Sequence, residues 1–153
     1  MNKVLVTTTG IGRASLEDLG VVSLKETPLR KMYELACNRA LRSAGKSVPL
    51  PAHLNAGIAF STVKGERFPH VWRDLVIAGK KLRPGHFLSA IHNAIPGYCA
   101  IQLGLIGPQI VLTSGSALQA AELQLLIGRA KLMLVCVPTG GKALAYVMER
   151  EDV

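Results

Sequence analysis

The residue best placed for nucleophilic chemistry is Ser116, in the segment QIVLTSGSALQAA. The apolar stretch Gln109–Thr113 predicts a short strand, Ser114-Gly115-Ser116 predicts a tight turn, and an apolar helix is expected to follow. The start of a helix carries free N–H groups and the positive end of the helix dipole, which together stabilise a developing anion. Some hydrolytic enzymes present their nucleophile on such a strand–turn–helix junction. Ser116 is therefore the candidate nucleophile.

A serine hydroxyl at this position would need an adjacent general base, because the helix dipole alone does not ionise so weak an acid. Of the four histidines, only His86 and His92 lie in the segment expected to fold near Ser116, and His92 is the candidate base. No carboxylate has a spacing that marks it as the third member of a triad. The alternative role is structural: Ser116 caps the following helix by accepting a hydrogen bond from the backbone N–H near Leu118 or Gln119.

Other chemistry-bearing residues give weaker signals. The three cysteines, Cys37, Cys99 and Cys136, are widely spaced in apolar surroundings, which predicts buried free thiols. Thr139-Gly140-Gly141 lies between two predicted strands and is more typical of a hairpin turn than of a phosphate-binding loop. The GIGRAS segment near the N-terminus lacks the full dinucleotide-binding spacing and its downstream acid. We expect neither a metal nor a cofactor.

The charge balance is basic, with a formal net charge of +8. A basic surface attracts nucleic acid, an anionic membrane or an acidic protein, although basic residues also serve simply as solvated helix faces. Only 5% of the residues are aromatic and none is interleaved with the basic groups, which favours an acidic protein over nucleic acid. No apolar run reaches the roughly 18 residues of a membrane span, and no signal-type cleavage region is present, so a cytoplasmic protein is expected. The local basic groups are Arg30/Lys31, Arg39/Arg42/Lys46 and Lys80/Lys81/Arg83.

The elements that would position these residues alternate along the chain, as in a single domain of residues 1–153. The pattern predicts an α/β fold, a mixed five-stranded sheet with helices on both faces. The predicted strands are Val4–Thr8, Ala56–Thr62, Gln109–Thr113, Lys131–Val137 and Ala143–Met148, with a weaker edge strand at Val21–Leu24. The predicted helices are a long one from Thr27-Pro28 to Gly45, then Pro69–Gly79, His86–Ala94, Tyr98–Leu105 and Ala117–Arg129, of which the last is expected to be buried because most of its faces are apolar.

Five phrases, in order, carry a resemblance to a known family: VLVTTTGIG, RKMYELACNRALRSAG, NAGIAFSTVKGE, HNAIPGYCAIQLGLIGP and ALAYVMERED. Together they resemble the N-terminal half of a β-ketoacyl synthase, a member of the thiolase-like fold. The resemblance implies that residues 1–153 form one β-ketoacyl synthase N-terminal-like domain, one half of that fold. It is closest to the short, divergent synthase-like proteins found beside bacterial type II fatty-acid or polyketide genes, such as those of aryl-polyene clusters.

The sequence departs from the family at two points that decide the expected function. Active β-ketoacyl synthases carry a catalytic Cys where this chain has Ser116. They also have a C-terminal half that supplies histidines or a lysine for condensation, and we expect that half to be missing here because the sequence ends at Val153. The resemblance therefore implies a non-catalytic accessory protein, a pseudoenzyme that pairs with a condensing-enzyme subunit or docks an acyl carrier protein.

A half-fold would leave a helix layer or a sheet edge uncovered, so we expect a homodimer or a heterodimer. Carrier proteins are acidic, and the candidate contacts to one are Arg39, Arg42, Lys80, Lys81 and Arg83. The second hypothesis is an enzyme, an acyltransferase or thioesterase that uses Ser116 as nucleophile and His92 as base. A nucleic-acid binder, favoured only by the charge, is the third.

Overall fold

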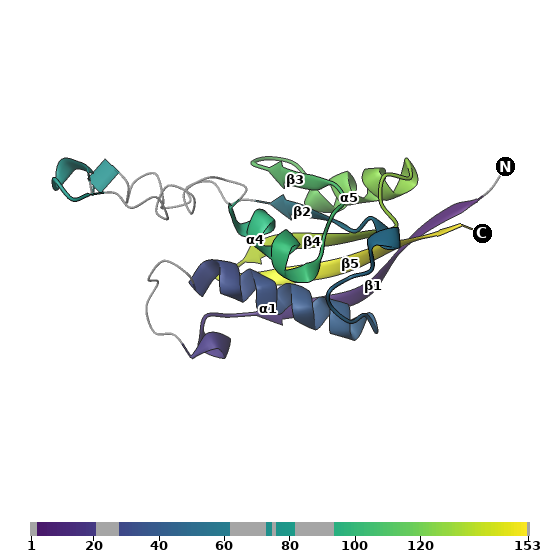
Figure 1. The fold of residues 1–153 in the computed structure, drawn as a ribbon, viewed down its shortest axis with the longest axis horizontal. Helices are drawn as coiled ribbons and strands as arrows, with labels where there is room; N and C mark the ends of the chain where they lie inside the picture. Colours follow the sequence, from purple (N-terminus) through teal and green to yellow (C-terminus); the bar gives the residue numbers. More distant parts are fainter. Residues whose placement is uncertain (1–2, 21–27, 62–72, 75, 82–93, 153) are drawn as a thin grey trace.

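A computed structural model of the chain describes residues 3–20, 28–61, 73–74, 76–81 and 94–152. Five strands form one mixed sheet in the order β1-β5-β4-β2-β3, and helices lie on both of its faces (Figure 1). The predicted fold class is therefore confirmed. The strands are β1 (Val4–Ala14), β2 (Gly57–Ser61), β3 (Gln109–Leu112), β4 (Leu132–Thr139) and β5 (Lys142–Asp152), and the helices are α1 (Pro28–Ser43), α4 (Ala94–Leu103) and α5 (Ala117–Leu126), with short 3₁₀ turns at Glu17–Leu19 and Ala52–Leu54.

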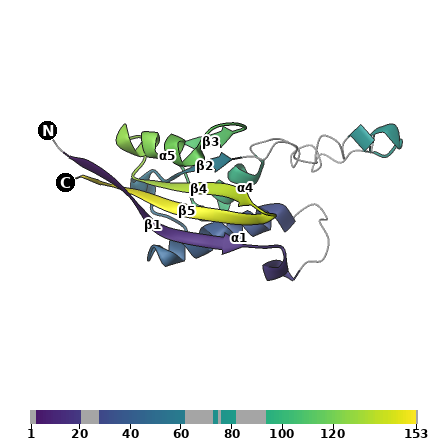
Figure 2. The ribbon, with the colours of Figure 1, turned by 180° about the vertical axis from the view of Figure 1, so that it is seen from behind.

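The sheet divides into an antiparallel part and a parallel part that share β4. Strands β1, β5 and β4 are antiparallel neighbours, whereas β2 runs parallel to both β4 and β3. The predicted hairpin between β4 and β5 is confirmed, and Gly140 and Gly141 both have positive φ in its turn, a conformation that glycine adopts without a steric penalty. The long β1–β5 ribbon brings the two ends of the chain to one end of the sheet (Figure 2).

Strand β1 is longer than the predicted Val4–Thr8 because two glycines lie inside it rather than ending it. A Cβ atom at Gly10 would overlap the backbone of Ala40, and one at Gly12 would overlap the backbone of Ala36 and Ala40. Helix α1 therefore packs directly onto the backbone of β1, and the glycines are required by this close approach rather than by a turn.

The two faces of the sheet are buried by different helices. Alternate residues of a strand point to opposite faces, and β4 follows this rule: Leu134 and Cys136 belong to the core under α1 and α4, and Met133 and Val135 to the core under α5. On the first face the rings of Tyr33 and Phe60 meet edge to face with centroids 4.9 Å apart. Both clusters contain fully buried side chains, so β4 lies at the centre of the fold.

Two expectations about the helices are wrong. The predicted break at Pro96-Gly97 is absent, and α4 continues through both residues. Pro96 is the third residue of the helix, where its missing N–H would have had no intrahelical partner. The helix expected over Ala117–Arg129 ends earlier, at Leu126, and is not buried all round, because it packs on the sheet through one face only.

Several predicted elements fall wholly or partly outside the described residues. These are the edge strand Val21–Leu24, the helix His86–Ala94 apart from Ala94, and most of the helix Pro69–Gly79, of which residues 73–74 and 76–77 are helical.

Candidate functional site

The strand–turn–helix junction forms as predicted and places Ser116 at the start of α5 (Figure 1). Gly115, with a φ of +89°, turns the chain between β3 and the helix. Ser116 is in the extended conformation of an N-cap residue, and its Oγ accepts a hydrogen bond of 3.2 Å from the backbone N–H of Gln119. The structural role expected for Ser116 is thus confirmed, since its hydroxyl satisfies one of the free donors of α5.

The chemistry available to Ser116 depends on a base. The side chain is exposed, so a substrate could reach it. Within the described ranges, Oγ forms this capping hydrogen bond and none to a histidine, lysine or carboxylate. His92, the candidate base, and His86 lie outside the described residues.

The candidate carrier contact Arg39 is already engaged within the protein. Its Nη1 donates to the backbone carbonyl of Arg13 at 2.8 Å and forms an ion pair with Asp18 at 2.9 Å. The Asp18 carboxylate also accepts the backbone N–H of Ser15 at 2.9 Å. The hydrogen bond from Ser15, followed by that from Arg39, lowers the pKa of Asp18. Arg39 therefore closes the loop after β1 and has less freedom to bind a partner.

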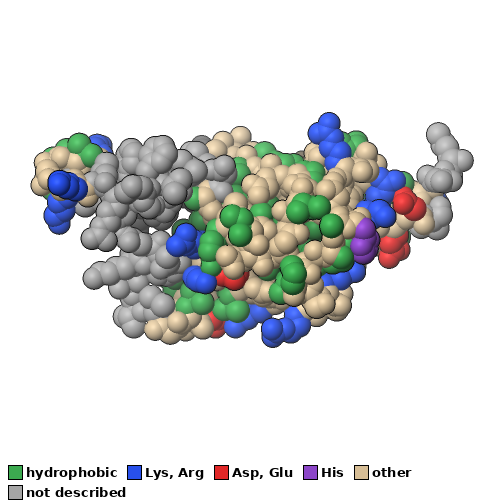
Figure 3. Space-filling view, in the orientation of Figure 1, with side chains coloured by type: hydrophobic (Ala, Val, Ile, Leu, Met, Phe, Trp, Pro, Cys, Tyr) green, Lys and Arg blue, Asp and Glu red, His purple; other side chains and the backbone are tan. Residues whose placement is uncertain are grey.

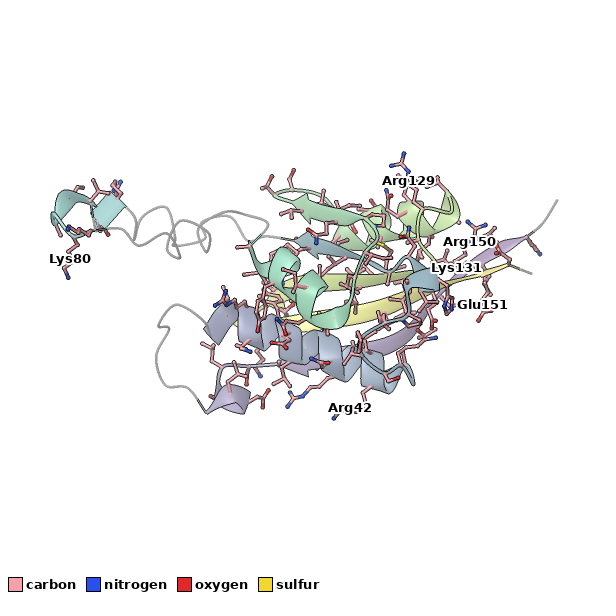
Figure 4. The ribbon with its side chains drawn as sticks, viewed as in Figure 1. Arg42, Lys80, Arg129, Lys131, Arg150 and Glu151 are labelled. Carbon is pink, nitrogen blue, oxygen red and sulfur yellow. The ribbon has the colours of Figure 1, made fainter. Side chains whose placement is uncertain are left out.

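The other candidate cations are distributed over separate parts of the chain. Arg42 is exposed near the end of α1, and its side chain forms no ion pair with a described residue. Lys80 and Lys81 are also exposed, and Figure 4 shows Lys80 well away from Arg42. Arg83 lies outside the described residues. The structure therefore does not gather Arg42 and Lys80 into one surface.

Arg30 and Lys31 belong to a group that the sequence did not indicate as a unit. Tyr98 of α4 donates a hydrogen bond of 3.0 Å from its hydroxyl to Glu34 of α1. The Arg30 guanidinium and the Lys31 ammonium lie 4.9 and 5.4 Å from the centre of the Tyr98 ring. The pKa of Lys31 is raised, first by a hydrogen bond between Lys31 and Tyr98 and then by the charge of Glu34. The three-residue spacing of Lys31 and Glu34 was visible in the sequence, but the contact of both with Tyr98 requires the tertiary fold.

The two edges of the sheet differ in how their backbone groups are satisfied. On β1, the N–H of Ile11 is 3.3 Å from Ser43 Oγ, and the carbonyl of Arg13 accepts from Arg39, so side chains of α1 cover this edge. On β3, Ile58 N–H donates to Pro108 O, and since alternate residues of a parallel strand face the same neighbour, Gln109 and Val111 point their backbone groups outward. No described residue supplies partners for them, so β3 is the open edge.

The inner side of α5 packs on the sheet, and its outer side is mixed, with exposed leucines beside the exposed Gln119 and Glu122. Ala117, Ala121 and Leu125 are buried, at the four-residue spacing of one helix face. Leu123 and Leu126 lie on the opposite side and are exposed. On the face of the molecule seen in Figure 3, hydrophobic side chains are scattered among polar and charged ones and do not form one large apolar surface.

The described residues contain no group of three side chains suited to hold a metal ion. The predicted free thiols are confirmed, since Cys37, Cys99 and Cys136 are all free and buried. None of the helices in the described ranges is both long and apolar enough to cross a membrane.

No protein-family model matches this sequence, and no functionally curated protein does. Several solved structures match. One is a chain of AntDE:AntF, a type II polyketide synthase acyl-carrier protein in complex with its ketosynthase bound to the hexaketide, with a TM-score of 0.70, 15% identity, and coverage of 97% of this chain and 64% of that one. A second comes from a ketosynthase in complex with its chain length factor from Xenorhabdus doucetiae, with a TM-score of 0.66, 12% identity, and coverage of 98% and 81%.

A third match is a β-ketoacyl synthase from Burkholderia phymatum, with a TM-score of 0.65, 12% identity, and coverage of 99% of this chain and 60% of that one. In two of the three cases this chain spans less than two thirds of the chain that it matches. At these identities the likeness shows the fold: the chain has the architecture of ketosynthase-type, thiolase-like proteins, as the resemblance in the sequence implied.

Proposed function

We propose that this protein is a non-catalytic, ketosynthase-like accessory protein of bacterial type II fatty-acid or polyketide biosynthesis, of the aryl-polyene-like kind. The observation that carries this proposal is the use of Ser116, which stands where the resemblance places the catalytic Cys. A Cys at a helix start gains thiolate character from the helix dipole. A serine hydroxyl is too weak an acid for the helix dipole to ionise. The Oγ of Ser116 instead caps α5 by accepting a hydrogen bond of 3.2 Å from the N–H of Gln119.

Two surfaces support pairing with another subunit as the mode of action. The edge of β3 offers the backbone groups of Gln109 and Val111, which pair with no described residue, and sheets extend by such edges. The outer side of α5 offers apolar side chains. The matched structures also include a ketosynthase in complex with its chain length factor and a ketosynthase in complex with an acyl-carrier protein, which makes a condensing-enzyme subunit the favoured partner.

Docking of an acyl carrier protein is the second part of the proposal. It would rest on charge attraction between an acidic carrier and basic residues, either Arg42 or the group Lys80, Lys81 and Arg83, since Arg42 and Lys80 lie apart. Arg39 contributes less than the others in this scheme, because Asp18 and the carbonyl of Arg13 already hold its guanidinium.

Co-purification from native cells at low salt, with mass spectrometry of the whole chain, tests the proposal. We expect a condensing enzyme or a carrier protein to accompany the chain, and Ser116 to carry no adduct. A protein recovered alone as a homodimer, with an acyl group on Ser116, would overturn the accessory function.

The alternative is a serine-dependent acyltransferase or thioesterase, favoured by the exposure of Ser116 at a helix start. In this scheme His92 takes the hydroxyl proton, Oγ attacks the thioester carbonyl, and the carrier thiol leaves as the acyl-serine ester forms. Incubation with an acyl-carrier thioester would then add the acyl mass to the wild type but not to Ser116→Ala. An unmodified wild type under conditions that acylate a known serine enzyme counts against the alternative.

A further inference from the structure

The three cysteines of this chain meet in one part of the core, although they are far apart in the sequence. Cys37 lies on α1, Cys99 on α4 and Cys136 on β4, and all three belong to the same buried cluster. The chain contains no other cysteine. A buried cysteine that serves only as a small apolar side chain has no reason to lie beside another one. Neither the fold nor the proposed function accounts for this convergence.

The sulfurs of Cys37 and Cys136 are close to the distance at which a disulfide forms. They lie 3.3 Å apart. A disulfide bond is about 2.05 Å long, so the two atoms have to approach by roughly 1.3 Å, which is within the reach of side-chain rotation. Cys99 also hydrogen-bonds to Cys37. Cys37 is therefore the sulfur that both of the other thiols contact.

Helices α1 and α4 seal the thiols from solvent. All three thiols are fully buried. Tyr98, next to Cys99, donates a hydrogen bond of 3.0 Å to Glu34, one turn before Cys37, and this bond ties α4 to α1 beside the sulfurs. The hydrogen bond with Cys37, and then burial, raise the pKa of Cys99, so the closed protein presents no reactive thiolate there. An oxidant can therefore react only while α1 and α4 are parted by a local opening.

We propose that Cys37 and Cys136 are a reversible thiol–disulfide site, which locks α1 onto β4 when a hydroperoxide oxidises it. While the core is open, the hydroperoxide transfers one oxygen atom to the sulfur of either thiol, which gives a sulfenic acid and releases the alcohol, or water in the case of hydrogen peroxide. The sulfur of the other cysteine then attacks the sulfenic sulfur. The S–S bond forms, the S–O bond breaks, and the hydroxyl group leaves with the thiol proton as water.

The electrons balance in both directions of this reaction. The two thiols lose two electrons, and the hydroperoxide gains them as its O–O bond breaks. A small dithiol reductant reverses the step by thiol–disulfide exchange, and it carries away the disulfide as its own oxidised form. Cys99 stays a free thiol throughout.

The bond would join a helix on one face of the sheet to the central strand. Cys37 and Cys136 are 99 positions apart, and a cross-link that closes so long a loop restricts the unfolded chain strongly. The oxidised protein should therefore be harder to unfold than the reduced one. The site acts within this chain, so it does not depend on the proposed function.

Mass spectrometry of peptides under non-reducing conditions tests the pairing. The full-length protein is treated with hydrogen peroxide at a concentration that leaves its circular dichroism unchanged, and the remaining thiols are blocked before digestion. We expect an intrachain disulfide between Cys37 and Cys136, with Cys99 free. Wild type oxidised in urea is the reference. An unfolded chain closes short loops most readily, and these two cysteines are the most widely separated pair, so their bond should form least often there.

Two variants separate this site from oxidation in general. Cys37→Ala removes the shared sulfur and should abolish the intrachain disulfide of the folded protein. Cys99→Ala, at an equally buried thiol, is the matched control and should keep it. Oxidation should raise the Tm of wild type and of Cys99→Ala by about 5–10 °C, reversibly with dithiothreitol, and should leave the Tm of Cys37→Ala in place. If Cys37→Ala fails to fold, the pairing found in wild type still decides.

The outcomes are clear for this site and do not involve the accessory function. Thiols that stay reduced in the folded protein, at a peroxide concentration that oxidises the unfolded chain, overturn the inference. A disulfide of Cys99 with either of the other cysteines overturns it too, as do disulfides between two chains in place of the intrachain bond. The accessory function is tested by co-purification and stands or falls separately.

Discussion

The two faces of the sheet are completed to different degrees by the same chain. Under α1 and α4 the sheet is covered by two helices, and the outer side of α1 is polar, with Arg42 exposed and Glu34 bonded to Tyr98. Under α5 the sheet is covered by one helix whose outer side carries the exposed Leu123 and Leu126 beside the exposed Glu122. The first face ends in a surface that water solvates well, and the second ends in a surface that another protein could cover.

The difference indicates which side of the sheet is the better place to look for an interaction surface. Both cores contain fully buried side chains, so both faces stabilise the isolated chain. On the α5 side, a row of buried side chains faces the sheet while Leu123 and Leu126 stay exposed on the outer side. Substitutions that act on one side and not on the other can therefore separate the residues needed for folding from those needed for association.

The largest expected effect is on the inner row of α5. Leu125→Ala removes a fully buried side chain and should lower the free energy of unfolding by about 2–5 kcal/mol. Its neighbour Leu126, which is exposed, is the matched control, and Leu126→Ala should change the same quantity by less than about 0.5 kcal/mol. Urea denaturation of the isolated chain measures both. Equal losses for the two variants would mean that the outer side of α5 is already buried in solution.

The next effect concerns the close contact between β1 and α1. Gly12→Ala would place a methyl group against the backbone of Ala36 and Ala40, and we expect a loss of about 1–3 kcal/mol in unfolding free energy. Gly97→Ala is the same substitution inside α4 with no atom within 4 Å, and it should be neutral or stabilising by up to about 1 kcal/mol. Thermal unfolding of the pair distinguishes a steric effect from a general response to glycine replacement.

A smaller effect is expected at the start of α5. Ser116→Ala removes the acceptor for Gln119 N–H and should cost about 0.5–2 kcal/mol of unfolding free energy. Ser116→Asp keeps an N-cap acceptor and should retain most of the stability. If Ser116→Ala is as stable as wild type, the cap does not contribute, and a role for the hydroxyl in chemistry becomes the better explanation.

The smallest effect is electrostatic and lies beside α1. The pKa of Asp18 is lowered, first by the N–H of Ser15 and then by Arg39, so the folded state binds its proton less readily than the unfolded chain. This contribution to stability is present above the unfolded value of about 3.9 and disappears as the pH falls through the lower folded pKa. In an NMR titration of the Asp18 carboxyl, Arg39→Gln should raise the midpoint only partly, because the Ser15 bond remains, and Arg42→Gln should leave it in place. An unchanged midpoint in Arg39→Gln contradicts the assignment.

Local patterns in the sequence predicted much of this fold correctly. The charge-free segment around Ile58 predicted β2, Thr27-Pro28 predicted the start of α1, and the preference of serine for N-caps predicted the bond of Ser116 to the start of α5. Each of these signals depends on residues close together in the chain. The break expected at Pro96 was wrong because a proline in the first turn of a helix removes no intrahelical bond.

The rest could not be predicted, because it depends on what meets in three dimensions. An apolar helix predicts burial, and α5 is apolar, but no pattern within it indicates whether a second layer covers its outer side. The pairing of Arg39 with Asp18 joins residues 21 positions apart and changes which cations are available to a partner. The proximity of the Tyr98 ring to Arg30 and Lys31 likewise follows from the packing of α4 on α1.

The three thiols have a practical consequence. Cys37, Cys99 and Cys136 come from α1, α4 and β4, are inaccessible to solvent, and lie close enough that the sulfurs of Cys37 and Cys136 are 3.3 Å apart. Bonding of Cys37 to Cys136, and of Cys99 to Cys37, raises the pKa of Cys37 and Cys99, so neither forms a reactive thiolate in the native state. Helix α5 contains no cysteine. The rate at which these three thiols are alkylated therefore reports how often the core under α1 and α4 opens to solvent. It does so without any substitution and independently of opening under α5.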